Sequence, residues 1–89
     1  MTEILAATPV SQVASGLSLH LRTLALADRK RINNDTDLSA LLGMPYPRLR
    51  HWLNNPGVVP NEMDLAALLK HYMPEYAIVP AMVVPVAVG

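Results

Sequence analysis

Apolar residues recur every three or four positions along the first long segment of the chain, residues 11–29. This stripe consists of Val13, Leu17, Leu21 and Leu24. The spacing is typical of an amphipathic helix. Either Thr8-Pro9 or Ser11 can start it, because Ser and Thr cap a helix N-terminus and proline is tolerated in the first turn. Leu19 and Leu26 lie off the stripe, so we expect this helix to carry a second packing surface.

A second, short helix is predicted after a polar connection at residues 29–35. Thr36 is its expected N-cap, and Asp37 places a negative charge in the first turn, where the helix dipole favours it. Gly43 ends the helix because the C-terminal cap often adopts a left-handed conformation that glycine tolerates. The expected buried side consists of Leu38, Leu41 and Leu42.

Two more helices follow, and prolines mark their limits. Pro45 and Pro47 fit the start of a third helix, since proline is tolerated in a first turn. The turn-forming segment 54–57 ends it. Asn61 caps a fourth helix, which Pro74 stops. The predicted buried residues of these two helices are Leu49, Trp52, Leu53, Leu65, Leu68, Leu69 and Tyr72.

The last part of the chain, residues 76–88, is rich in valine and has no helix-capping residues. It predicts an extended segment, and because Pro80 and Pro85 cannot donate to a central strand, we expect an edge strand. One small domain is not expected to cover so many apolar side chains, so we predict that this tail pairs with a second copy. The predicted dimer contacts are Ile78, Val79, Met82, Val83, Val84 and Val86. The first helix, through Leu19 and Leu26, is the alternative dimer surface.

These elements predict a mainly α fold of four to five helices with a C-terminal extended segment or edge strand. The expected organisation is an N-terminal arm at residues 1–10, a helical domain at 11–74 and an apolar tail at 75–89.

Composition adds that 89 residues make one domain, which at this size often depends on a partner subunit. Hydrophobic residues reach 52% and charged residues 16%, and the mean hydropathy is +0.26. This argues against disorder and favours burial of apolar surface against another copy. Cysteine is absent, which excludes disulfides and thiolate chemistry and fits a cytoplasmic protein. We expect no export signal and no membrane-spanning segment, since the longest apolar stretch is short and interrupted by prolines.

The formal net charge is zero, but the charges are unevenly placed. Residues 22–54 hold six basic side chains against three acidic ones. The basic residues are Arg22, Arg29, Lys30, Arg31, Arg48 and Arg50, and the acidic residues are Asp28, Asp35 and Asp37. A basic centre of this kind favours contact with a polyanion.

Residues 36–55 resemble the helix-turn-helix of phage Cro and repressor proteins and their plasmid relatives. The resemblance rests on an apolar and then a small residue in the first helix, an apolar residue and glycine that close it, an apolar turn residue, and apolar anchors in the second helix. These residues are Leu38, Ser39, Leu42, Gly43, Met44, Leu49 and Trp52. The resemblance implies a lambda-repressor-like domain over roughly residues 13–73, in which the second helix of the motif enters the major groove of DNA.

The resemblance also implies which side chains contact DNA. Pro45 and Pro47 stand where the family often has residues that cap the helix or donate hydrogen bonds, so base contacts are expected from Tyr46, Arg50 and His51. The main reader is Arg50, because a guanidinium matches the O6/N7 edge of guanine. The expected contacts to the DNA backbone are Thr36, Arg48, Asn54 and Asn55.

No spacing typical of a catalytic or metal site is evident. His20, His51 and His71 lie too far apart in sequence to form a recognisable metal motif. We therefore expect no enzyme activity, no metal, no cofactor and no small-molecule substrate. The prediction is a homodimeric, sequence-specific repressor of phage or plasmid type that binds palindromic operators in double-stranded DNA. The alternative is a helical interaction module whose apolar tail binds another protein.

Overall fold

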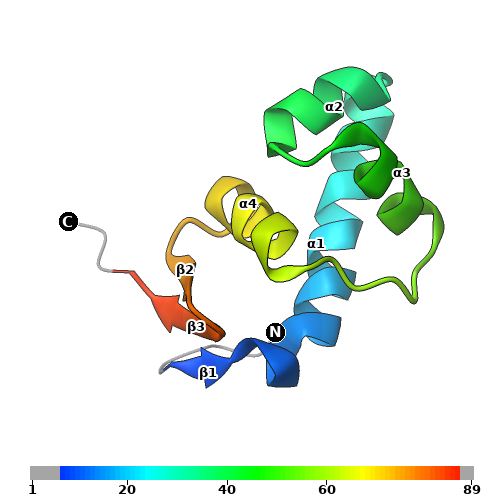
Figure 1. Cartoon of the computed structure of the whole chain (residues 1–89). Coiled ribbons are helices and arrows are strands. Elements are labelled where there is room, and N and C mark those ends of the chain that lie inside the picture. The colour runs from blue at the N-terminus through cyan, green and yellow to red at the C-terminus, as the bar shows by residue number, and fades with distance from the viewer. Residues whose placement is uncertain (1–6, 87–89) are drawn as a thin grey trace.

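A computed structural model describes residues 7–86 (Figure 1). This part of the chain is mainly helical and carries a small antiparallel sheet. In chain order the elements are β1 (Thr8–Pro9), α1 (Val10–Ile32), α2 (Asp35–Leu42), α3 (Tyr46–Asn54), α4 (Glu62–Tyr72), β2 (Tyr76–Val79) and β3 (Met82–Pro85). The prediction of four to five helices is met by four, and the helical class is confirmed.

Helix α1 is longer than its apolar stripe predicts. It begins at Val10, directly after β1, and continues to Ile32. The basic residues predicted to form a connection are instead its last turn, where positive charge is favoured by the exposed carbonyl groups. Asn33 ends the helix in a left-handed conformation, with φ of 54°, and its N–H donates to the Arg29 carbonyl.

The cap of α2 differs from the prediction. Asn34, and not Thr36, is the N-cap, because its side-chain oxygen accepts from the backbone N–H groups of Thr36 and Asp37. At the other end Gly43 takes the predicted left-handed cap conformation, with φ of 68°. Leu41 was expected in the core but is 44% exposed.

The core is formed by all four helices together with Val83 of β3, and its largest side chain is the fully buried Trp52. The indole N–H of Trp52 donates to the Ser18 hydroxyl at 2.9 Å, and this hydroxyl donates to the Val58 carbonyl at 3.1 Å. This chain of bonds satisfies the indole N–H of Trp52 and the hydroxyl of Ser18, which are both buried. Leu26, expected on a second surface, packs against the core, whereas Leu19 is 53% exposed.

The two ends of the described chain meet in one sheet of order β1-β3-β2 (Figure 1). Strands β2 and β3 form a hairpin whose turn holds Pro80 and Ala81, and β1 pairs with the far side of β3. The edge-strand prediction is therefore correct for β2 and wrong for β3, which is central. Pro85 is tolerated there because it is the last residue in the ladder, opposite Tyr76.

The sheet also divides the residues predicted to form a dimer contact. Val83 is fully buried and Ile78, opposite it, packs against the core. The prediction that Val83 contacts a second copy is therefore wrong, because the domain itself covers that face. By strand alternation the other four predicted contacts lie on the opposite, outer face: Val79, Met82, Val84 and Val86.

The expected arm and tail are consequently not separate from the helical domain. Residues 8–9 of the arm pair with residues 82–83 of the tail, and β2 lies against α4. Residues 1–6 of the arm and 87–89 of the tail lie outside the described residues.

Candidate nucleic-acid interface

Helices α2 and α3 are joined by a tight connection that fixes their relative position. Met44 in this connection is buried, and its N–H donates to the Ser39 carbonyl at 3.2 Å. The Ser39 hydroxyl in turn donates to the Met44 carbonyl. The small side chain of Ser39 thus holds the connection through a hydrogen bond and also allows the helices to pack closely. Helix α3 begins immediately afterwards at Tyr46.

Helix α3 has one buried side and a broad exposed side. Leu49, Trp52 and Leu53 face the core. Since successive residues of a helix are rotated by about 100°, the exposed residues divide into three groups. Pro47, His51 and Asn54 point directly away from the core, Tyr46 and Arg50 lie on one flank, and Arg48 lies on the other.

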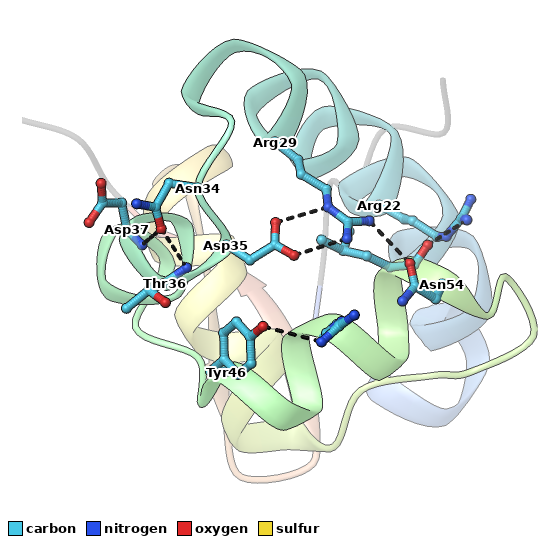
Figure 2. Close-up of polar contacts among 10 residues, drawn as sticks. Arg22, Arg29, Asn34, Asp35, Thr36, Asp37, Tyr46 and Asn54 are labelled. Atoms are coloured by element: carbon cyan, nitrogen blue, oxygen red, sulfur yellow. Dashed lines mark hydrogen bonds and ion pairs between the residues drawn. The ribbon is translucent and has the colours of Figure 1, made fainter.

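Tyr46 and Arg50 form an exposed pair one turn apart on α3. The Arg50 guanidinium donates to the Tyr46 hydroxyl at 3.4 Å, a long hydrogen bond (Figure 2, where Tyr46 is labelled). Within residues 7–86 Arg50 is the one arginine that is bound neither to a carboxylate nor to a main-chain carbonyl. Its donors are therefore available to an incoming ligand.

Arg48 is occupied. Its guanidinium binds the Asp64 carboxylate of α4 through two hydrogen bonds, at 2.8 and 3.2 Å. The Asp64 side chain is only 4% exposed, and its bond to Arg48 raises the pKa of the guanidinium above the usual value. Arg48 therefore ties α3 to α4, so a contact to the DNA backbone would have to compete with this ion pair.

Two arginines of α1 reach the C-terminal end of α3 (Figure 2). Arg22 donates to the Leu53 carbonyl at 2.7 Å, and Arg29 donates to the Asn54 side-chain oxygen at 3.1 Å. Arg22 and Arg29 are seven residues apart, so they share one face of α1. They add positive charge beside the exposed side of α3, although Asp35 neutralises Arg29.

Asn55 also has a partner in the described structure. Its side-chain amide donates to the His51 carbonyl at 2.7 Å and lies 3.3 Å from the His51 ring nitrogen Nδ1. The amide therefore satisfies a carbonyl at the last turn of α3, and both residues remain exposed. His51 and Asn55 therefore lie beside each other at the end of the helix.

The backbone N–H groups at Thr36, a predicted contact to the DNA backbone, are not free. The amides of Thr36 and Asp37 already donate to the Asn34 side chain, at 3.0 and 3.1 Å. The carboxylates of Asp35 and Asp37 stand in the same turn, and negative charge there opposes a phosphate. A phosphate could bind these two backbone amides only by displacing the Asn34 cap.

Five of the predicted contact residues thus share the exposed side of α3 and its end: Tyr46, Arg50, His51, Asn54 and Asn55. Reasoning from sequence missed Arg22 and Arg29 as neighbours of this side. Their spacing of seven within a helical pattern was the signal that could have found them. Among residues 7–86 no group of three metal-binding side chains is present, and no described helix is long and apolar enough to cross a membrane.

Comparison with known proteins adds no relatives to this picture. No family model matches the chain, and no curated protein and no solved structure matches it. The functional argument therefore rests on the geometry of α2 and α3 and on the charges around them.

Proposed function

We propose that this protein is a sequence-specific DNA-binding transcriptional regulator, a repressor of phage or plasmid type that acts in the cytoplasm. The observation that carries the proposal is the exposed Arg50 on α3. It follows a tight helix-turn-helix connection and has no carboxylate partner among the described residues. Because few bonds must be broken before this arginine meets a ligand, its desolvation costs less than that of Arg48 or Arg29.

In the proposed complex α3 lies in the major groove. Arg50 donates two hydrogen bonds to the O6 and N7 atoms of a guanine, which is the commonest specific contact of an arginine with DNA. Tyr46 releases its long bond to Arg50 and contacts a phosphate or a thymine methyl group. His51, which points away from the core, contacts the neighbouring base edge.

Positive charge around the end of α3 supports backbone contacts. Arg22 and Lys30 lie on α1 and have no ion pair with a carboxylate among residues 7–86. Asn54 and Asn55 offer amide donors at the end of α3. Such groups set the position of a protein on DNA without reading its sequence.

A homodimer is proposed on the outer face of the sheet. This face is apolar, with Val79 at 53% and Val86 at 42% exposed, and Met82 and Val84 lie between them. Isologous packing of this face would form a two-fold dimer. A subunit of 36 × 30 × 23 Å is of a size that could set two α3 helices about 34 Å apart, one turn of DNA, so the operator would be palindromic.

The dimer is tested by Val84→Glu, which places a charge on the outer face while leaving the buried Val83 intact. Light scattering at micromolar concentration should give the mass of a dimer for the original protein and of a monomer for the variant. Thr23→Glu, an exposed change on α1, is the control and should stay dimeric. A dimer that persists in Val84→Glu would move the interface elsewhere, with Leu19 on α1 as the next candidate.

The function is tested by letting the original protein select duplexes from a random pool. The dissociation constants of these duplexes are then measured for the original protein and for Arg50→Ala. We expect the preference for one or two base pairs per half-site to fall about fivefold or more, since a bidentate arginine contributes roughly 1–3 kcal/mol of discrimination. Lys70→Ala removes the same charge from α4 and should leave sequence preference unchanged. If the protein selects no sequence, the proposed function is wrong. If Arg50→Ala keeps the full preference, the assigned reading face is wrong.

The alternative is an interaction module that binds another protein through the same apolar sheet face. The observation in its favour is that this face carries no charged residue between 76 and 86. Salt separates the two functions. DNA binding weakens steeply as salt rises because phosphate contacts release counterions, whereas an apolar interface responds little.

A further inference from the structure

Arg29 lies at the junction of three helices. It belongs to the last turn of α1, and its Nε and one terminal nitrogen donate to the two carboxylate oxygens of Asp35, each at 2.9 Å. Its other terminal nitrogen donates to the side-chain oxygen of Asn54 at 3.1 Å. A single guanidinium therefore links the first turn of α2 to the last residue of α3 (Figure 2).

This arrangement determines how the Asn54 amide is turned. A guanidinium can only donate hydrogen bonds, so the atom of Asn54 that meets it must be the carbonyl oxygen. The amide nitrogen, on the other branch of the same carbon, is then turned away from Arg29. No bond from this nitrogen is recorded within residues 7–86, and Asn54 is exposed on the outermost line of α3.

Asp35 explains why Arg29 is suited to hold an amide instead of binding DNA itself. Its carboxylate takes both donors on one side of the guanidinium, neutralises the charge and fixes the plane of the group. The Arg29 and Asp35 side chains are 29% and 21% exposed, so the pair is held within the helix junction. The remaining terminal nitrogen faces Asn54.

We propose that Arg29 is a positioning residue: it orients Asn54 so that the amide nitrogen donates to a phosphate oxygen of the bound DNA, once per half-site. This inference rests on the proposed DNA-binding function. An Asn54 without Arg29 rotates freely and presents either its oxygen or its nitrogen, and the oxygen is repelled by a phosphate. Arg29 thereby contributes to binding without touching the DNA.

The chain offers a matched control for removing this arginine. Arg31 lies in the same last turn of α1, and its ion pair with Asp28, at 3.1 Å, stays within that helix. Arg29→Met and Arg31→Met therefore remove the same charge from the same turn, and only the first breaks the link to α2 and α3. Arg29→Lys is a second variant that keeps the charge beside Asp35, but it lacks the rigid planar fork with which the guanidinium binds Asp35 on one side and orients Asn54 on the other.

The experiment uses the duplex that the original protein selects from a random pool, with one phosphate at a time replaced by a neutral methylphosphonate. For the original protein we expect one position per half-site at which the methylphosphonate weakens binding about fivefold or more. The Asn54→Ala variant should no longer be sensitive to the methylphosphonate at this position. Arg29→Met and Arg29→Lys should lose this sensitivity at the same position. Arg31→Met should weaken binding to every duplex but should remain sensitive to the methylphosphonate at that position.

The outcomes separate the inference from the function on which it rests. A protein that selects no duplex contradicts the proposed function and the inference together. If binding is selective but Arg29→Met and Arg29→Lys remain sensitive to the methylphosphonate at the position assigned to Asn54, the inference alone is overturned. The inference alone is also overturned if Arg31→Met loses that sensitivity. Thermal melts establish whether each variant is folded. If Arg29→Met is unfolded, Arg29→Lys tests the inference.

Discussion

Replacing Trp52 by alanine is the most direct test of how α3 is held. The indole is fully buried in the core, and its N–H donates to Ser18 of α1. Alanine would leave a large cavity and an unused acceptor on the Ser18 hydroxyl. Phenylalanine would fill most of the space and remove only the N–H and part of the ring.

The expected magnitudes follow from these contacts. A buried Trp→Ala change costs about 3–5 kcal/mol, whereas domains of this size are stable by roughly 5–13 kcal/mol. Trp52→Ala should therefore leave a protein that is marginal or unfolded at 25 °C. Trp52→Phe should cost about 1–2 kcal/mol through the lost hydrogen bond and a smaller cavity, which corresponds to a melting temperature lower by roughly 4–16 °C.

The assay is urea unfolding followed by far-ultraviolet circular dichroism, because Trp52 is the single tryptophan and the variants lose its fluorescence. In the original protein the emission of Trp52 should be shifted to the blue and should move to the red on unfolding. Emission typical of a water-exposed indole, or equal midpoints for Trp52→Ala and the original protein, would refute the packing argument.

Two further predictions concern charged groups. Hydrogen bonds from Tyr72 and Arg31 hold the pKa of Asp28 below its ordinary value of 3.8, so its carboxylate stabilises the fold above about pH 4 and this contribution is lost as the pH falls through the lower folded pKa. Tyr72→Phe should flatten the pH dependence of the melting temperature in that acid range, and an unchanged profile would contradict the role of Tyr72. Arg48→Ala should lower the melting temperature more than Arg50→Ala, because only Arg48 neutralises a buried carboxylate; equal melting temperatures in thermal scans would contradict this division.

Helix positions were accessible from the sequence because each is specified locally. Gly43 and Asn61 mark the ends of helices through the conformation or the hydrogen bonds that each supplies. The burial of Trp52 and Leu49 follows from helical spacing alone. The error at the cap of α2 is also local: Asn34 and Thr36 are both good caps, and the choice depends on where the left-handed Asn33 directs the chain.

The sheet was not predictable in the same way, because its central strand depends on a contact between the two ends of the chain. β1 is two residues long, too short to produce a pattern. Without β1, β3 has no second neighbour, and the sequence alone predicts that its valines pack against another subunit. The buried Val83 and the outer Val84 differ only in which side of this sheet they occupy, so a single tail sequence serves both the core and the proposed dimer face.

The charges illustrate the same limit and its consequence for the candidate site. Counting finds an excess of positive charge between residues 22 and 54, but ion pairs decide which of those charges a ligand can use. Within residues 7–86 carboxylates hold Arg29, Arg31 and Arg48. Arg22, Lys30 and Arg50 lack a carboxylate partner there, and of these only Arg50 lies on α3. A base-reading arginine must exchange its existing partners for a base edge, and a long bond to a tyrosine hydroxyl is easier to exchange than an ion pair. Arg29 and Arg48 instead fix the helix that presents Arg50, so the two kinds of arginine serve one surface in different ways.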